Sequence, residues 1–179
     1  MSATDAIYAF ADGLAASAAA VPAEAEPVQL ETWVTFFLGA ETFALAVTAV
    51  SEIVRIGTIT RVPDAPPAVR GIVNLRGRVI PVVDLRVRLG LAAGDPGPAA
   101  RVLVGSLRGR VIGLLVDAVG EVVRLDPRTL EPPPPDVMTA RTEYIRAVQQ
   151  RGPALLILLD AERVLMLPAD AALPTSERN

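Results

Sequence analysis

An internal repeat constrains the fold of this chain more than any other feature. The segment Ala49-Val-Ser-Glu-Ile-Val-Arg-Ile56 returns 69 residues later as Ala118-Val-Gly-Glu-Val-Val-Arg-Leu125, with five of its eight positions identical. The same offset places residues 45–47 on residues 114–116, and an offset of 76 places residues 79–84 on residues 155–160. Self-similarity at a fixed spacing indicates a duplicated structural unit.

Each copy consists of short runs rich in β-branched residues and separated by turn residues, a pattern typical of strands joined by hairpins. Pro81 lies inside one of these runs and predicts an edge strand or a bulge, because proline cannot donate a ladder hydrogen bond. We expect strands at residues 33–38, 42–47, 54–62, 72–75, 79–83, 101–107, 111–116 and 155–159, and an irregular segment at the four prolines 132–135.

The duplication predicts an all-β fold of two similar small barrels that face each other across a pseudo-twofold axis. Both lie in one domain, residues 29–179, which ends in a short helix and a tail. We place the first barrel at about residues 30–90 and the second at about residues 100–160. These bounds leave open whether the two barrels exchange strands.

Residues 1–28 are rich in alanine and lie outside the repeat. Ile7, Phe10 and Leu14 have the spacing of one helix face, with Thr4 as a candidate N-cap. The Pro/Ala/Glu stretch at residues 21–27 is typical of an extended linker. Two interpretations stay open for this region: a tail without structure, or a short helix that docks on the barrels.

Composition excludes most catalytic chemistry. The chain has no cysteine and no histidine, and all 17 of its basic residues are arginine. Disulfides, Cys/His metal sites, Ser-His triads and a catalytic lysine are therefore excluded, so we expect no enzyme, no metal and no cofactor. The first basic residue is Arg55, so no positive start precedes an apolar stretch, and no apolar run is long enough to span a membrane. We expect a cytoplasmic protein.

Two acidic pairs and one basic stripe are candidate sites. Asp84 and Asp160 are equivalent acids that each precede a segment with helical spacing, which favours helix capping over a catalytic pair. Asp117 and Glu121 have the spacing of a shared helix face, yet without a third acid they predict solvent exposure and not a cation site. A basic stripe of arginines between residues 76 and 88 has no interleaved aromatic residue, which argues against nucleic-acid binding.

The hairpin string Val69-Arg-Gly-Ile-Val-Asn-Leu-Arg-Gly-Arg-Val-Ile-Pro-Val-Val-Asp-Leu85 carries a family resemblance. Taken alone it predicts a tight turn in which Gly77 takes a positive φ and Arg76 points to water. The string also closely resembles the signature of the CheW family, the adaptors of bacterial chemotaxis arrays. Further matching segments bring the resemblance to roughly residues 30–167: they are residues 34–39, 50–53, 111–117 and 142–145.

The resemblance implies two five-stranded SH3-like barrels without catalytic activity. Members of this family couple the cytoplasmic tip of methyl-accepting chemotaxis receptors to the regulatory domain of the histidine kinase CheA, and so associate with membrane receptor arrays without inserting into the membrane. The receptor tip lies in an apolar groove between the barrels. The residues of this sequence that we expect to bind partners are Val50, Glu52, Ile53, Gly71, Asn74, Arg76, Val119 and Val122.

Two other classes of function stay as alternatives. A CheW-like scaffold can serve a paralogous chemosensory pathway, such as pilus or gliding motility. A nucleic-acid binder or an enzyme on small barrels is the alternative of a different class, and its motifs are missing from this chain.

Overall fold

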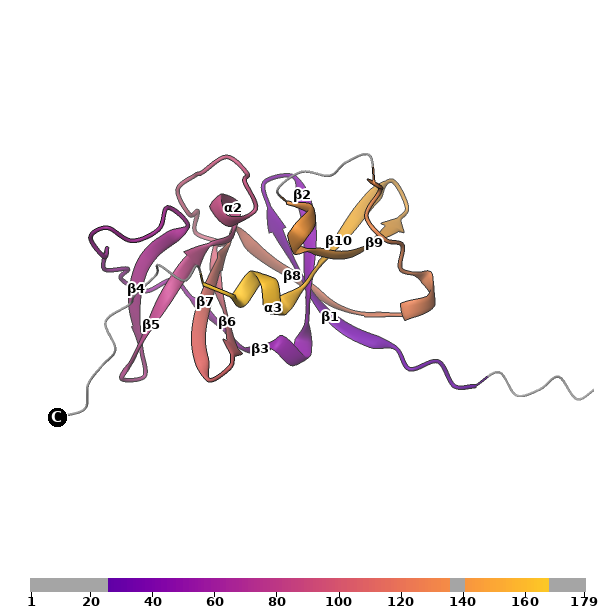
Figure 1. Ribbon diagram of the computed structural model, residues 1–179, viewed down its shortest axis with the longest axis horizontal. Coiled ribbons are helices and arrows are strands. Elements are labelled where there is room, and N and C mark those ends of the chain that lie inside the picture. Colours follow the sequence, from indigo (N-terminus) through magenta and orange to yellow (C-terminus); the bar gives the residue numbers. More distant parts are fainter. Residues whose placement is uncertain (1–25, 136–140, 168–179) are drawn as a thin grey trace, which may run out of the picture.

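The computed structural model describes residues 26–135 and 141–167, so the expectations for the N-terminal segment fall almost entirely outside the described residues. Two five-stranded sheets make up the fold, which is all-β with a few short helices (Figure 1). The strands are β1 (Glu31–Leu38), β2 (Glu41–Ala46), β3 (Val50–Arg55), β4 (Val69–Leu75), β5 (Arg78–Asp84), β6 (Arg101–Leu107), β7 (Arg110–Val116), β8 (Ala118–Leu125), β9 (Ile145–Arg151) and β10 (Ala154–Leu159).

Each barrel is built from strands of both halves of the chain. Barrel A has the strand order β8-β1-β2-β10-β9, and barrel B has the order β3-β6-β7-β5-β4. The third strand of each repeat therefore pairs with the first strand of the other repeat: β3 pairs with β6 in barrel B, and β8 pairs with β1 in barrel A. Residues 30–90 and 100–160 are the two sequence copies, and neither range by itself makes up a sheet.

Strand pairing follows the sequence repeat in register as well as in order. Val50 of β3 lies opposite Gly105 of β6, and Val119 of β8 lies opposite Phe36 of β1. Val119 lies 69 residues after Val50, and Gly105 lies 69 residues after Phe36, so the two pairs are equivalent. The β3–β6 and β1–β8 ladders also carry a register shift at equivalent positions. The two barrels are pseudo-symmetric at the level of single residue pairs.

Three apolar clusters hold the fold together. One fills barrel A around Trp33, a second fills barrel B around Val102, and the largest lies between the barrels. The cluster between the barrels takes Phe36 and Phe43 from barrel A and Leu103 and Leu114 from barrel B, all of them almost fully buried. Burial of this shared cluster makes the two barrels one packing unit.

Short helical turns connect the strands, and the two α-helices among them begin at the predicted acids. In the described part of the chain these elements are η1 (Val47–Ala49), α2 (Leu85–Arg88), η2 (Pro127–Thr129), η4 (Thr142–Tyr144) and α3 (Ala161–Leu165). Asp84 accepts hydrogen bonds from the amides of Arg86 and Val87, and Asp160 accepts one from the amide of Arg163. The predicted capping role of both acids is confirmed.

Three expectations from the sequence were wrong. Pro81 lies on β5, an inner strand between β4 and β7; it is tolerated there because the pairing with β7 begins only at Val82. The expected strand at 54–62 ends at Arg55, and only a single bridge at Thr60 follows. Asp117 and Glu121 share no helix, since β7 and β8 are separated only by Asp117 and Glu121 lies on β8. The polar strand β9 was not predicted.

Candidate partner-binding surface

The eight candidate residues lie on β3, β4, the β4–β5 turn and β8. β3 and β8 are edge strands, one in each barrel. Val50 and Val119 occupy equivalent positions at the starts of these strands, and both are half-buried against the cluster between the barrels. Part of each valine therefore supports the core, and part of it faces solvent.

Ile53 and Val122 are the exposed apolar residues of the two edge strands. Ile53 is 43% exposed and Val122 is 62% exposed, and the two positions are equivalent by the 69-residue offset. An exposed aliphatic side chain contributes little to the core, so these two residues are free to contact a partner.

Glu52 and Arg76 are brought together by the closure of barrel B. The guanidinium nitrogen Nη2 of Arg76 lies 3.1 Å from Oε2 of Glu52, although β3 and the β4–β5 turn stand at opposite ends of the strand order. The Arg76 side chain is 80% exposed and that of Glu52 is 28% exposed. The pair thus presents a largely accessible guanidinium held beside a carboxylate.

The turn that carries Arg76 has two left-handed residues. Arg76 has φ +52° and Gly77 has φ +83°, the geometry of a two-residue hairpin between the paired residues Leu75 and Arg78. The positive φ of Gly77 and the exposure of Arg76 were predicted; the positive φ of Arg76 was not. Arginine is disfavoured in this conformation, so the turn alone does not explain why it stands there.

Gly71 and Asn74 have local structural contacts. A Cβ atom at Gly71 would stand 2.2 Å from the carbonyl oxygen of Thr60, which pairs with the neighbouring Ile72. The side-chain oxygen of Asn74 accepts a hydrogen bond of 2.8 Å from the amide of Gly77. Both residues shape the β4–β5 hairpin and so position Arg76.

A second ion pair, which we did not predict, mirrors the first in barrel A. Nη1 of Arg151 lies 3.1 Å from Oε1 of Glu121, and Glu121 is the equivalent of Glu52. The 76-residue offset puts Gly152 at the position of Arg76, one residue past Arg151. Glu121 could therefore be predicted from the repeat as the equivalent of Glu52. Arg151 could not, because it lies one residue before the position equivalent to Arg76.

A partly buried polar link joins the two barrels. Nε of Arg86 donates to both carboxylate oxygens of Asp117 at 2.8 and 2.9 Å, Nη2 of Arg86 also contacts this carboxylate, and the amide of Gly39 donates to it at 2.6 Å. Burial alone would raise the pKa of Asp117, but the hydrogen bonds from Arg86 and Gly39 and the attraction to Arg86 hold that pKa below its usual value. The link ties α2 of barrel B to the β1–β2 turn of barrel A.

Within residues 26–135 and 141–167, no group of three or more acidic, cysteine or histidine side chains is arranged to hold a metal ion. In the same part of the chain, no helix has the length and apolar character needed to cross a membrane.

Comparison with known proteins places the chain in a family. The model of the CheW-like domain matches residues 32–168. The chain is 31% identical over 145 residues to the chemotaxis protein CheW of Rhizobium meliloti, covering 81% of this chain and 88% of that protein. It is 29% identical to the protein PilI of Pseudomonas aeruginosa, covering 78% of this chain and 79% of PilI.

A solved structure agrees with the fold. The crystal structure of the scaffolding protein TtCheW from Thermoanaerobacter tengcongensis superposes with a TM-score of 0.72 at 29% identity, covering 83% of this chain and 96% of that one. The repeat, the exchanged strands and the hairpin signature all lie inside the region that matches the family. The chain belongs to the CheW-like domain family.

Proposed function

We propose that this chain is a non-catalytic chemosensory adaptor that couples the cytoplasmic tip of methyl-accepting receptors to the regulatory domain of a CheA-type histidine kinase. It acts in the cytoplasm, joins receptor arrays through these partners and requires no cofactor. The observation that carries the proposal is the combination of exposed apolar side chains on β3 and β8 with an accessible, ion-paired arginine in the β4–β5 turn. The chemotaxis and scaffolding names of its relatives support the same role.

The surface suits an amphipathic helical partner. Ile53 and Val122 offer apolar contacts without a role in the core, and Val50 and Val119 continue this apolar character toward the boundary between barrels. A helix can place its apolar face on such residues while a carboxylate or carbonyl meets the guanidinium of Arg76. Glu52 holds the guanidinium in place and leaves most of it accessible.

The first test removes the arginine. Arg76→Ala should leave the free energy of unfolding within about 0.5 kcal/mol, as is usual at an exposed site, and should weaken binding of a receptor-tip fragment or kinase regulatory domain by about 1–3 kcal/mol. Arg76→Lys should restore part of this loss, because lysine keeps the charge and loses the fork. Titration calorimetry beside thermal melts measures both quantities.

Arg108 provides a matched control for this test. Arg108 is the first of the two turn residues between β6 and β7, as Arg76 is between β4 and β5. It has φ +50° and is followed by Gly109 at φ +79°. Arg108→Ala therefore changes the same turn chemistry at a position outside the candidate surface. Normal binding of both partners by Arg76→Ala would remove Arg76 from the site.

A second test introduces charge into the apolar part of the surface. Val122→Asp should abolish receptor-tip binding, whereas Leu155→Asp on β10 should not, although Leu155 is also exposed, at 44%. Equal effects of the two substitutions would mean that the apolar surface of β8 is not used.

The relation to PilI supports a second candidate of the same kind, an adaptor of a paralogous chemosensory pathway. Both candidates predict binding to a kinase regulatory domain, and they differ in which kinase is bound. Parallel pull-downs with the regulatory domains of each chemosensory kinase in the same genome separate them.

Purified protein should not turn over ATP; turnover that survives purification and denaturation controls would contradict the adaptor role.

A further inference from the structure

A small pocket beside the β6–β7 turn of barrel B has no part in the proposed function. It has a volume of about 210 Å³ and is lined by residues of β6, β7, their turn and the end of α3. Ile112 and Leu165 line it and are almost fully buried, whereas Met166 is 47% exposed. Clefts that hold drug-sized ligands measure roughly 300–1,000 Å³, so this pocket suits a single large apolar side chain.

The walls of the pocket are held in place by packing and hydrogen bonds. Nη2 of Arg88 donates to the carbonyl oxygen of Arg163 at 3.0 Å and to that of Met166, and so fixes the end of α3. Leu165 packs on Gly105 of β6, where a Cβ atom would stand 2.9 Å from a methyl carbon of that leucine. Because the walls are already ordered, an occupant meets a formed pocket and little ordering entropy is lost on binding.

The rim of this pocket is basic. Arg108 and Arg110 stand on it, both are exposed, and neither has an ion-pair partner among the described residues. Arg108 also holds a left-handed φ of +50°, which arginine disfavours and which asparagine or glycine would adopt more readily. Two unpaired guanidinium groups above an apolar pocket favour an occupant that combines carboxylates with an apolar side chain.

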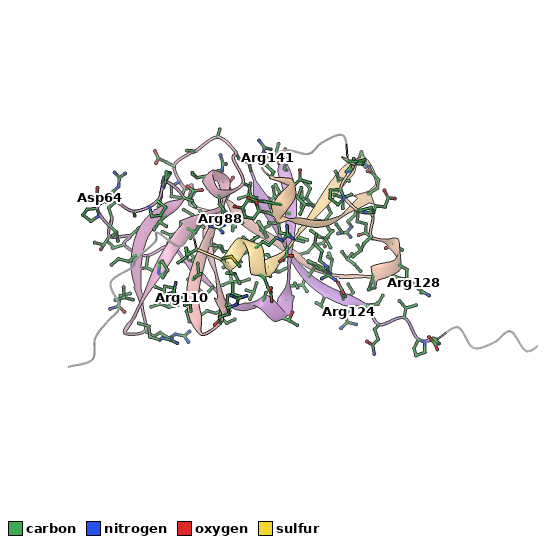
Figure 2. The ribbon with its side chains drawn as sticks, viewed as in Figure 1. Asp64, Arg88, Arg110, Arg124, Arg128 and Arg141 are labelled. Carbon is green, nitrogen blue, oxygen red and sulfur yellow. The ribbon has the colours of Figure 1, made fainter. Side chains whose placement is uncertain are left out.

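Barrel A has a pocket at the equivalent place, with a different charge. Its lining includes Glu41, Phe43 and Leu89, which the offsets of 69, 69 and 76 residues place on lining residues of the barrel B pocket. Oε1 of Glu41 lies 4.0 Å from Nη1 of Arg141, so acid and base stand together there. Arg110 replaces Glu41 in barrel B, and Figure 2 shows Arg110 and Arg141 on opposite sides of the molecule. The two pockets are separate, and the one in barrel B has the stronger demand for an anion.

We infer that the barrel B pocket binds a protein segment that carries a large aliphatic or aromatic residue between acidic residues. The apolar side chain enters between Ile112 and Met166, and the flanking carboxylates meet Arg108 and Arg110. Methionine adapts its shape to different side chains, which suits a pocket that receives one residue of a short segment. The site does not include Arg76, so the inference is independent of the proposed function.

Methionine methyl NMR tests the inference on the full chain, because the sequence has only three methionines, Met1, Met138 and Met166. Protein isotope-labelled in the methionine methyl groups is titrated with the peptide Gly-Ser-Asp-Leu-Glu-Ser-Gly, blocked at both ends. The Met166 signal, assigned with Met166→Leu, should shift as peptide is added. Peptides in which serine replaces the leucine, or in which asparagine and glutamine replace the acids, should each bind about tenfold more weakly.

Matched arginine variants test the charge contact. Arg110→Gln should weaken peptide binding about fivefold, an effect that salt should diminish. Arg78→Gln is the control, because Arg78 follows the β4–β5 turn as Arg110 follows the β6–β7 turn, is also exposed, and does not line this pocket. Binding of the receptor tip by Arg110→Gln should equal that of the wild type, so a failure of this inference can be told from a failure of the proposed function.

Three results would overturn the inference directly. They are a Met166 signal that does not respond to millimolar peptide, equal binding of the three peptides, and equal losses of affinity in Arg110→Gln and Arg78→Gln. Circular dichroism of each variant verifies that the barrels are folded before affinities are compared.

Other occupants of the pocket would overturn it as well. A Met166 signal that shifts with protein concentration alone would mean that a second copy fills the pocket. A signal that shifts in Leu173→Ser without peptide would mean that the chain's own C-terminal residues fill it. A response to phosphatidylglycerol vesicles in place of the peptide would mean that the arginines bind a lipid surface.

Discussion

The two barrels share one topology and differ in how their interiors are filled. Trp33 is fully buried in barrel A, and its equivalent in barrel B is Val102. Ala44 of barrel A corresponds to Gly113 of barrel B, where a Cβ atom would stand 2.6 Å from a methyl carbon of Val102. The two barrels therefore share the same pairing register, but at both of these positions barrel A has the larger side chain.

The edge strands β4 of barrel B and β9 of barrel A show the same difference. Gly71 of barrel B corresponds to Ala147 of barrel A. In barrel B the carbonyl of Thr60 approaches Gly71 so closely that no Cβ fits, whereas Ala147 of barrel A is buried in the cluster that contains Trp33. Barrel B is packed by close backbone approach, and barrel A is packed by one large aromatic side chain.

The largest expected effect comes from removing the residue that sets the size of barrel A. Trp33→Ala should lower the free energy of unfolding by about 3–5 kcal/mol, because the cavity left by the indole cannot collapse fully. Val102→Ala is the matched change in barrel B and should cost less, since fewer buried atoms are removed. Urea denaturation of both variants measures this; equal losses would show that the two interiors are equally well packed.

The next effect comes from exchanging the small residues at the equivalent positions of β4 and β9. Gly71→Ala should cost about 1–3 kcal/mol, the usual cost of overpacking, because the new methyl group meets the Thr60 carbonyl. Ala147→Gly, the reverse change in barrel A, should cost about 0.5–1 kcal/mol through chain entropy. If Gly71→Ala does not lower the free energy of unfolding, the segment around Thr60 can move to admit the methyl group. The proposed difference in packing between the two barrels would then be wrong.

The link between Arg86 and Asp117 should stabilise the fold by a smaller, pH-dependent amount. We expect Asp117→Asn to cost about 1–2 kcal/mol near neutral pH, the range for hydrogen bonds to charged groups. The folded state lowers the pKa of Asp117, so the carboxylate contributes its stability above the unfolded pKa of about 3.9 and loses it as the pH falls through the lower folded value.

Chemical denaturation of the wild type and Asp117→Asn between neutral and acid pH tests this dependence. The two curves of stability against pH should converge at the acid end. A gap that persists unchanged there would mean that packing, and not ionisation, makes Asp117 important.

The smallest effects concern the two matched Arg-Gly turns. Arg76→Gly and Arg108→Gly each relieve a left-handed φ, so each substitution should raise the free energy of unfolding by up to about 1 kcal/mol. The gain at Arg76 should be smaller by a few tenths of a kcal/mol, because among the described residues Arg76 has a carboxylate partner and Arg108 has none. Thermal melts at low and high salt isolate that difference; identical gains would show that the Glu52–Arg76 pair adds nothing to stability.

The sequence by itself determined the duplication, most of the strands, both helix caps and the family. These features depend on local spacing: a repeated octapeptide, alternation within strands, and an aspartate directly before a helical segment. Val50 with Val119 and Ile53 with Val122 could be paired from the repeat alone, because the offset is constant over these strands.

Only the tertiary structure decided which barrel receives β3 and β8. Each repeat contains the same pairing edges, so the local pattern fits both an exchanged and an unexchanged arrangement. Only η1, three residues, joins β2 to β3, and such a turn advances about 6 Å. The free side of β1 lies two strand spacings away, about 10 Å, so the chain cannot cross its own sheet and passes into the other barrel. The same closure brings Glu52 to Arg76 and Glu121 to Arg151, contacts that no local spacing encodes.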